Sequence, residues 1–334
     1  MRPAKKILND PRNVVAEMIE GLELASDGKV RRLPGVDALV KTDIPDGKVA
    51  LLIGGGRGHE PIFHGFIGHN LADGAACGQV FAAPAPDIIY EAAKAVHRGK
   101  GVLFLYGNYA GDNMNFDIAA EMLADDGIDV RTVRVRDDVA AAPPERVEDR
   151  RGVAGDVLMI KIAGAAAATL DSLDEVERVA RKAEANVRSI GVAVSAGSIP
   201  ETGKPTFELA DDEIEVGMGA HGEAGVHRQK LAPADQVADQ LAEAILSDLP
   251  FVAGDEVALL LNNLGATTMM EMLIVNRRLR QILKERNIRV HRTLMGTWLT
   301  VQEMAGFSVT MMRLDEELKR YLDMPCDSFG LSRM

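Results

Sequence analysis

The chain has little cysteine and fewer basic than acidic residues. Its 334 residues include two cysteines, Cys77 and Cys326, and no Cys-x-x-Cys pair. Neither a disulfide framework nor a structural zinc site is therefore indicated, and both residues are expected to be buried thiols. With 38 basic and 50 acidic residues the formal charge is -12, so the charge balance favours binding neither to nucleic acid nor to an anionic membrane surface.

Long apolar runs are also absent. The first ten residues are charged and lack the apolar run of a signal peptide, and no later segment is long and apolar enough to span a bilayer. We therefore expect a cytoplasmic protein that does not enter a membrane. No internal repeat, low-complexity segment or long Gly/Ser linker occurs. A chain of 334 residues exceeds the usual size of a single core, which predicts two domains.

The apolar pattern predicts α/β structure in both halves. Residues 49–53 and 102–106 are short apolar runs typical of buried parallel strands, and helical patterns alternate with them. A helical tract from residue 155 closes this first domain, placed at residues 1–189. The second domain, residues 190–334, continues the alternation. Its expected strands are 190–194, 257–261 and 288–290, and the expected helices of the chain include 14–22, 87–98, 115–125, 233–246 and 268–285.

A glycine-rich segment follows the first predicted strand. Residues 54–61 read Gly-Gly-Gly-Arg-Gly-His-Glu-Pro, at the end of a strand where open α/β sheets usually bind ligands. The segment contains neither Gly-x-Gly-x-x-Gly nor a Walker lysine, so it is not predicted to hold ATP. His59 is a candidate acid, base or hydrogen-bond donor, or else a residue at the start of a helix. His64 and His69 follow at intervals of five, which do not share a helix face, so no metal site is predicted.

Two further segments carry candidate functional residues. Residues 107–117 follow the strand 102–106, and Asp112 in this Gly/Asn-rich turn could accept a proton from a substrate hydroxyl or serve as a capping residue. Residues 219–225 place His221 among three glycines and two alanines. This composition would expose a nucleophilic imidazole to a small molecule, although it also suits a flexible surface loop.

Together, the three segments are similar to the active-site segments of the dihydroxyacetone kinase K subunit, the ketose-binding component of that kinase family. The family writes them Gly-Gly-Gly-Ser-Gly-His-Glu-Pro, Lys-Asn-Tyr-Thr-Gly-Asp and Gly-Ile-His-Gly-Glu-Pro-Gly. The resemblance extends along nearly the whole chain, including residues 150–154 and 261–266. It implies the two-domain α/β fold of the K subunit and, usually, a homodimer.

The resemblance also implies a mechanism. The histidine that matches His221 adds to the substrate carbonyl and forms a covalent hemiaminal, which a polyol such as glycerol cannot form. His59 would assist as acid or base, and Asp112 would accept the proton of the hydroxyl that attacks phosphorus. The expected substrate-binding positions are Gly56, Arg57, Gly58 and Gly107.

In this family the nucleotide is carried by an all-helical L domain, which binds ATP, or ADP that a phosphotransferase-system subunit rephosphorylates. No second helical array or acidic magnesium cluster follows the K-like region before Met334. We therefore expect no cofactor in this chain, and a separate L subunit that brings ATP or ADP with Mg. The isolated chain would bind a ketose without phosphorylating it.

Two departures from the family pattern bear on the substrate. Arg57 stands where serine is usual and Gly107 where lysine is usual, which would free volume and move a cation to the other wall of the pocket. This suits a larger ketose, such as erythrulose or a branched pentulose. Alternatively, Arg57 points to solvent or to a dimer face and the pocket accepts dihydroxyacetone. Ala220 and Ala224 replace isoleucine and proline, which loosens the loop.

Two other functions remain open. Some relatives of the K subunit are ketose-sensing coactivators of a transcription regulator and do no catalysis. A sensor needs only carbonyl capture by His221, so the presence of Asp112 favours the kinase. A sugar isomerase that uses His59 and Asp112 would leave the hemiaminal histidine without a purpose.

Overall fold

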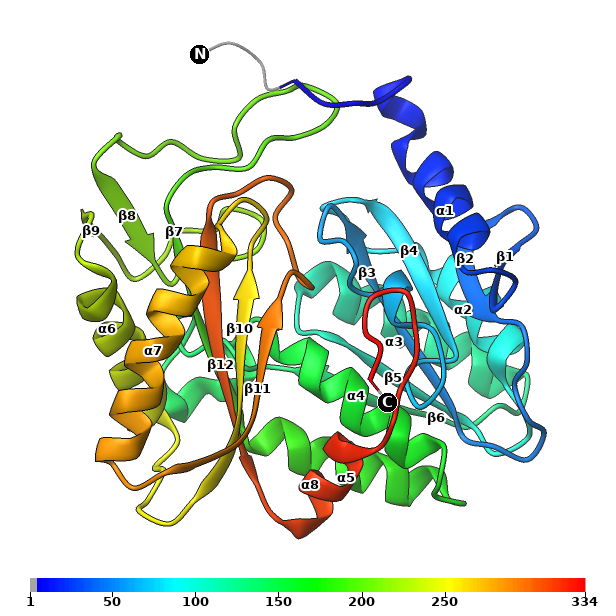
Figure 1. Ribbon diagram of the computed structural model, residues 1–334. Helices are drawn as coiled ribbons and strands as arrows, with labels where there is room; N and C mark the ends of the chain where they lie inside the picture. Colours follow the sequence, from blue (N-terminus) through cyan, green and yellow to red (C-terminus); the bar gives the residue numbers. More distant parts are fainter. Residues whose placement is uncertain (1–4, 334) are drawn as a thin grey trace. The chain divides into compact units, whose positions relative to one another are not determined.

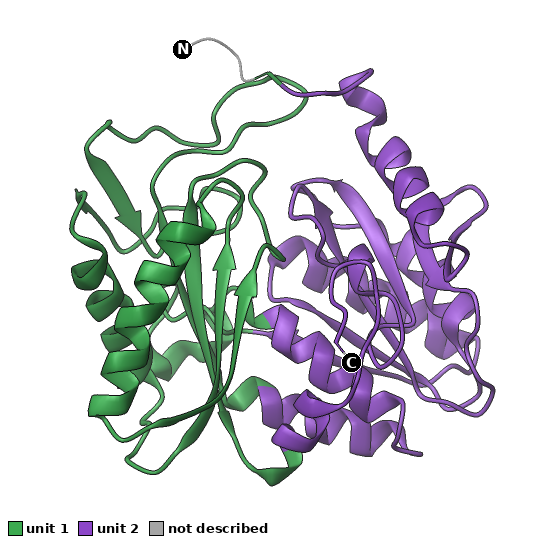
Figure 2. Cartoon of the chain, in the orientation of Figure 1, with its two compact units in different colours: residues 1–5, 136–155, 184–317 green, residues 6–135, 156–183, 318–334 purple. Residues whose placement is uncertain are grey.

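The computed structural model describes residues 5–333 and divides them into two compact units (Figure 2). Unit 1 consists chiefly of Arg136–Gly155 and Glu184–Glu317, and unit 2 of Lys6–Val135, Asp156–Ala183 and the segment from Leu318 onward. Each unit is therefore built from separate stretches of the chain. The boundary predicted between residues 189 and 190 falls inside a strand, β7 (Val187–Ala193).

Unit 2 contains a six-stranded sheet with the order β1-β2-β4-β3-β5-β6 (Figure 1). The pairs β3/β4, β3/β5 and β5/β6 are parallel, whereas β1/β2 and β2/β4 are antiparallel. The two strands predicted at 49–53 and 102–106 are confirmed as the neighbouring strands β3 and β5. The strands are β1 (Val30–Leu33), β2 (Val36–Lys41), β3 (Ala50–Arg57), β4 (Gly74–Val80), β5 (Val102–Gly107) and β6 (Val130–Val135).

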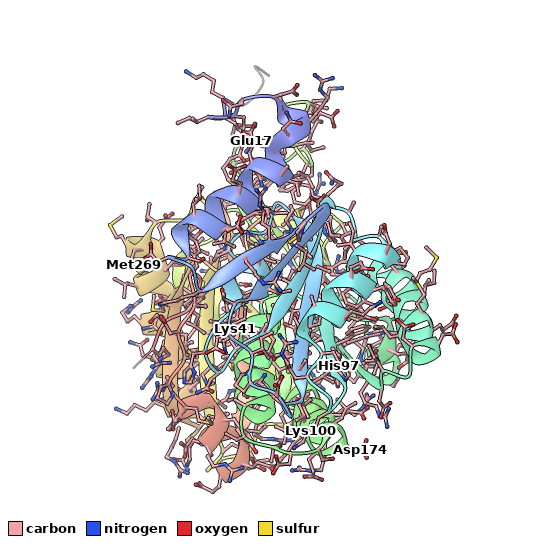
Figure 3. The ribbon with its side chains drawn as sticks, turned by 90° about the vertical axis from the view of Figure 1, so that its right-hand side faces the viewer. Glu17, Lys41, His97, Lys100, Asp174 and Met269 are labelled. Atoms are coloured by element: carbon pink, nitrogen blue, oxygen red, sulfur yellow. The ribbon has the colours of Figure 1, made fainter. Side chains whose placement is uncertain are left out.

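Two helical segments of unit 2 begin where the sequence places a cap or a proline, η1 after Asp10 and α2 at Pro86. The Asp10 side chain accepts a hydrogen bond from the Arg12 amide and caps a short 3-10 helix, which leads into α1 with Glu17 in its first turn (Figure 3). The helices are η1 (Pro11–Asn13), α1 (Val14–Ala25), η2 (His64–Phe66), α2 (Pro86–Val96), α3 (Ala110–Asp125), α4 (Gly155–Ala167), α5 (Leu173–Ala185) and α8 (Glu316–Asp323).

Helices α2 and α3 cover one face of this sheet. Ile89 and Val96 of α2 and Phe116 of α3 belong to one buried cluster with Leu52 and Phe104 of the central strands. Apolar burial on this scale is the main favourable term in folding. It holds the ends of β3 and β5, where two of the candidate segments begin, on a packed core.

The last segment of the chain returns to unit 2. The Lys161 Nζ donates to the Tyr321 carbonyl at 2.7 Å, and the Gly330 amide donates to the Gly65 carbonyl at 2.6 Å. Residues 156–183 and the C-terminal segment thus belong to the same unit as residues 6–135, which lie far from the C-terminal segment in the sequence. The predicted boundary assumes that the chain passes only once from one domain to the other. The long-range bonds show that later segments return to unit 2, so the observed units differ from the predicted domains.

Unit 1 contains a second six-stranded sheet with the order β11-β10-β12-β7-β8-β9. Only β10 and β11 are parallel, so the second α/β domain is mostly antiparallel. Helices α6 and α7 pack side by side on one face of it (Figure 1). The remaining elements of the unit are η3 (Pro144–Asp149), β8 (Glu213–Val216), β9 (His227–Lys230), α6 (Ala234–Asp248), β10 (Glu256–Asn263), α7 (Met269–Glu285), β11 (Arg289–Gly296) and β12 (Gly306–Leu314).

Several sequence expectations can be compared with the fold. Cys77 and Cys326 are buried free thiols, as predicted. Within residues 5–333, no helix is long and apolar enough to cross a membrane. Across the same residues, no group of three or more His, Cys, Asp and Glu side chains is arranged to hold a metal ion.

Candidate functional site

Two of the three candidate segments start at the same edge of the unit 2 sheet. Strands β3 and β5 are parallel neighbours, with Leu52 opposite Phe104 and Ile53 opposite Leu105. The segment containing His59 follows β3, and the segment containing Asp112 follows β5. Parallel strands end at one edge, which is where open α/β sheets usually bind ligands. The sequence placed both segments correctly at strand ends.

The glycines in the last residues of β3 and directly after it are explained by close packing. Gly58 has φ +101°, and a Cβ there would lie 2.6 Å from the Phe81 ring. A Cβ on Gly56 would lie 2.8 Å from the amide nitrogen of Ala82. Only glycine avoids both the left-handed strain and these overlaps. The backbone of this segment is therefore wedged against the residues that follow β4.

His59 is buried, with 5% of its surface exposed, and its ring centroid lies 5.1 Å from that of Phe81. No helix begins at His59, so its alternative interpretation as a helix-start residue is wrong. The adjacent Glu60 carboxylate accepts a hydrogen bond from the Gly58 amide at 2.9 Å. The His59 imidazole therefore packs against the Phe81 ring, and the Glu60 carboxylate fixes the backbone at Gly58 next to it.

Asp112 lies in the first turn of α3 and is half-buried. The helix begins at Ala110, five residues before the predicted start, so the Gly/Asn-rich turn is its first turn. Gly107 is the buried last residue of β5, and the next amide, that of Asn108, donates to the Val135 carbonyl at 3.0 Å. The Asn113 side chain donates to that of Asn108 at 2.8 Å. These bonds fix the backbone between Gly107 and Asp112.

Arg57 does not point to solvent, because only 1% of its surface is exposed. Its Nη2 donates to the Gly55 carbonyl at 2.7 Å, and its Nη1 contacts the Nδ1 of His64. Burial, and then the positive charge of Arg57, lower the pKa of His64 well below its ordinary value. His64 is therefore neutral and accepts a hydrogen bond from the guanidinium. The alternative of a solvent-directed Arg57 is wrong, and both of its terminal nitrogens contact protein groups.

His221 lies in unit 1, in the loop between β8 and β9, and its side chain is 28% exposed. The loop is an internally bonded turn: the Gly219 amide donates to the Glu223 carbonyl at 3.0 Å, and the Gly222 amide donates to the Gly219 carbonyl at 3.2 Å. Gly222 has φ +84°, which glycine adopts without strain. The imidazole is thus presented at the surface of unit 1 by a hydrogen-bonded loop.

Glu223 is a partner of His221 that the sequence analysis missed. One carboxylate oxygen accepts from the His221 amide at 2.8 Å, and the other lies 3.2 Å from the ring Nδ1. Burial alone would raise the pKa of Glu223, but hydrogen bonds from the His221 side chain and from backbone amides lower it to about 2. An ionised carboxylate can only accept, so the proton of a neutral His221 is on Nδ1. Nε2 is then the ring nitrogen that carries the lone pair. The His-x-Glu spacing was the signal in the sequence.

A small cavity of about 20 Å³ lies within unit 1 behind the loop, lined by Met218, Gly219 and Ala220 among others. A space of this size holds one water molecule. It is too small for a three- or four-carbon sugar, so a substrate of that size would approach His221 from the exposed side of the loop.

Comparison with known proteins identifies the family. The Dak1 domain matches residues 20–330. The chain is 46% identical over 327 residues to the dihydroxyacetone-binding subunit DhaK of a PTS-dependent dihydroxyacetone kinase of Listeria innocua, and this match covers 97% of the chain and 98% of the relative. The chain therefore belongs to the Dak1 family of dihydroxyacetone kinase K subunits. The resemblance predicted from the three segments is confirmed.

Other relatives show how the family varies. The chain is 39% identical to the L-erythrulose 1-kinase of Mycolicibacterium smegmatis, and the match covers 96% of the chain but 57% of that protein. A solved structure titled as the dihydroxyacetone kinase operon co-activator Dha-DhaQ superposes with a TM-score of 0.90 at 30% identity, covering 95% of the chain and 98% of the co-activator. The predicted two-domain fold of the K subunit is confirmed by this similarity.

Proposed function

We propose that the chain is the ketose-binding subunit of a kinase of the dihydroxyacetone type. It would hold a short-chain ketose covalently on His221 while a separate subunit supplies the phosphoryl group. The observation that carries the proposal is the His221–Glu223 pair, in which a carboxylate with a lowered pKa contacts Nδ1 of a partly exposed imidazole. Membership of this family supports a ketone as the substrate that this pair would capture.

The covalent step is an addition across a C=O bond. The Nε2 lone pair of His221 forms a bond to the ketone carbon, and the π electrons move to the oxygen, which takes a proton. The oxygen takes this proton from a general acid or from water, and the positively charged imidazole, whose Nδ1–H is hydrogen-bonded to the Glu223 carboxylate, gives one proton to water. The net result adds N and H across the carbonyl and expels nothing. A polyol has no such carbon, so glycerol is not captured.

We assign the proton transfers to unit 2. His59 would act as acid or base at the ketose oxygens, and Asp112 would take the proton of the terminal hydroxyl as that oxygen attacks phosphorus. The backbone at Gly56 and Gly58 would line the substrate. The placement of the His59 and Asp112 segments at one sheet edge supports this assignment.

The substrate would be dihydroxyacetone or a tetrulose such as erythrulose. Arg57 contributes less to this choice than its sequence position suggested, because its Nη1 and Nη2 contact His64 and the Gly55 carbonyl. The space left by Gly107, where lysine is usual, then carries the case for a larger ketose. A relative that phosphorylates L-erythrulose supports this reading.

The phosphoryl donor would be a separate L subunit that carries ATP, or ADP with Mg recharged by a phosphotransferase-system subunit. The match along 98% of a relative named as a subunit of a PTS-dependent kinase supports a divided enzyme. We further propose that the chain acts in the cytoplasm as a homodimer.

A second candidate is a ketose-sensing coactivator without catalysis. The structural similarity to a co-activator, at a TM-score of 0.90, favours it. The two functions differ in what they require of Asp112, since capture alone needs His221 and phosphoryl transfer also needs a base at the hydroxyl.

The test is to incubate the purified chain with short ketoses, aldoses and glycerol, without reductant, and to measure intact mass. We expect a mass increase equal to the full mass of the ketose, which His221→Ala abolishes, and none with glycerol. Adding an L subunit and ATP should then yield a phosphorylated ketose. Absence of an adduct with every ketose, in folded protein, would reject the proposal, and an adduct without phosphorylation would favour the sensor.

A further inference from the structure

Behind the His221–Glu223 pair lies a third charged residue, Arg151. Its Nη1 is 4.0 Å from the Glu223 Oε2, and its Nη2 donates to the Gly217 carbonyl at 3.2 Å. The side chain of Arg151 is 14% exposed, so solvent screens these contacts only in part. Arg151 therefore contacts the loop at its entry, Gly217, and at the carboxylate that faces the imidazole.

Asp138 fixes Arg151 from the opposite side. Its Oδ2 lies 3.0 Å from Nε and 2.7 Å from Nη2 of the guanidinium, so a single carboxylate oxygen contacts two guanidinium nitrogens. The Asp138 side chain is 3% exposed, and its Oδ1 accepts from the Ala140 amide at 3.0 Å. The backbones of the two residues are also joined, because the Asp138 amide donates to the Arg151 carbonyl at 3.1 Å. The guanidinium thus has one well-defined position.

Gly219 is the residue that makes room for this arrangement. A Cβ at this position would overlap both the Nη1 of Arg151 and the Oε2 of Glu223. The charged ends of two side chains occupy the volume where any other residue would place its side chain. Gly219 therefore leaves room for the side chains that contact Glu223 and the loop, in addition to leaving His221 exposed.

We propose that Arg151 and Asp138 are positioning residues for His221. Asp138 orients Arg151, Arg151 holds the Glu223 carboxylate and the loop entry, and Glu223 keeps the imidazole proton on Nδ1 so that Nε2 presents its lone pair. The use of that lone pair rests on the proposed function, whereas the position of the proton does not. Neither Arg151 nor Asp138 needs to touch the substrate.

The first measurement is therefore made without ketose. In protein labelled with ¹⁵N at histidine, long-range proton–nitrogen NMR distinguishes Nδ1–H from Nε2–H, and comparison with His221→Ala assigns the signal. We expect the Nδ1–H form in the wild type and a mixture with Nε2–H in Arg151→Met. Arg151→Lys retains the charge but not the fork that reaches both Asp138 and Gly217, so it should be intermediate.

The second measurement is the fraction of adduct formed with dihydroxyacetone. Loss of a supporting partner commonly costs about 10–100-fold at metal sites, where it is best measured, and we expect about a tenfold loss for Arg151→Met. Gly219→Ala should show the same loss and the same change of tautomer, although it removes no charged group. The control is Arg277→Met, which removes an exposed ion pair with Asp235 on α6 and leaves the loop unchanged.

Unchanged tautomer in both Arg151→Met and Gly219→Ala, with each protein folded by circular dichroism, would overturn the inference. A wild-type protein that forms no adduct, but whose tautomer depends on Arg151, would reject the proposed function and uphold the inference. The two failures are therefore distinguishable.

Discussion

The two glycine-rich segments of this chain look alike in sequence and differ in what fills the space beside their glycines. At the end of β3, a Cβ on Gly55 or Gly58 would meet the aromatic rings of Phe63 and Phe81 respectively. In the His221 loop, a Cβ on Gly219 would meet the charged ends of Arg151 and Glu223. Gly55 and Gly58 are thus packed against aromatic rings, whereas Gly219 is packed against the ends of two charged side chains.

This difference has consequences for energetics. An aromatic ring in a packed core cannot move aside without disturbing its neighbours, whereas the end of an arginine or glutamate side chain can rotate. Substitutions of glycine at the end of β3 should therefore reduce stability. Substitution of Gly219 in the His221 loop should reduce function at little cost in stability.

The largest effects are expected from His221 in unit 1 and Asp112 in unit 2, which are assigned to different chemical steps. His221→Ala should abolish both the covalent adduct and phosphorylation of the ketose, since in the proposed mechanism His221 alone forms the bond to the carbonyl. Asp112→Ala should retain the adduct, while phosphorylation with an added L subunit falls by about 10²–10⁴, the usual contribution of a general base. Intact mass and product formation measure the two quantities on the same samples. Full activity of Asp112→Ala would remove its role as base.

A pair of glycine variants tests the comparison itself. Gly55→Ala should lower the free energy of unfolding by about 1–3 kcal/mol, because its Cβ overlaps the Phe63 ring. Gly219→Ala should cost less stability but lose adduct. Denaturant titration and adduct mass give both values. Equal losses of unfolding free energy in Gly55→Ala and Gly219→Ala would show that the two segments do not differ in how rigidly their glycines are packed.

Arg57 provides a third test, because it separates stability from specificity. Arg57→Ser leaves the Gly55 carbonyl and His64 without their donor, and we expect a loss of about 1–3 kcal/mol with an unchanged ranking of ketoses. Gly107→Lys should instead shift the preference toward dihydroxyacetone by filling the space near the substrate. Competition between dihydroxyacetone and erythrulose for adduct formation measures the ranking. A changed ranking in Arg57→Ser alone would restore it as a substrate-binding residue.

A further expected effect is a pH dependence of stability from Asp138. Burial raises the pKa of Asp138 from 3.8 to about 6, against the opposing charge of Arg151. The folded state then binds a proton that the unfolded state has lost, so this group makes the protein less stable as pH rises from about 4 to about 6. Asp138→Asn removes this slope. The unfolding free energy of the wild type minus that of Asp138→Asn should therefore decrease as pH rises from about 4 to about 6. A difference that stays constant over this range would contradict the assignment.

Much of the fold was predictable from the sequence, because it follows from continuous apolar runs. Strands β3, β5 and β10 and helices α2, α6 and α7 lie close to their predicted ranges. Strand β12 was missed because Ser308 and Thr310 interrupt its apolar pattern, yet both are buried, and Thr310 bonds Ser189 at 2.6 Å across the sheet. A polar side chain satisfied by a neighbouring strand gives no local signal.

The candidate site was predictable where it consists of contiguous motifs. His59, Asp112 and His221 were proposed as site residues from the segments that contain them, and Glu223, which contacts His221, could have been added from its spacing to that histidine. Arg151 and Asp138 could not, because Arg151 contacts the loop at Gly217, 66 positions away in the sequence, and Asp138 contacts Arg151. The orientation of Arg57 was also beyond the sequence, since it depends on His64 being buried and neutral.

The most direct test of the account follows the ketone carbon of the substrate. Dihydroxyacetone labelled with ¹³C at its carbonyl is mixed with the unlabelled chain, and the carbon spectrum is recorded with wild type and with His221→Ala. The account predicts that the wild type converts the bound fraction from a ketone signal to that of a tetrahedral carbon bonded to nitrogen and oxygen, and that the variant does not. A bound ketone signal that remains unchanged in the wild type, or a tetrahedral signal that persists in His221→Ala, would contradict it.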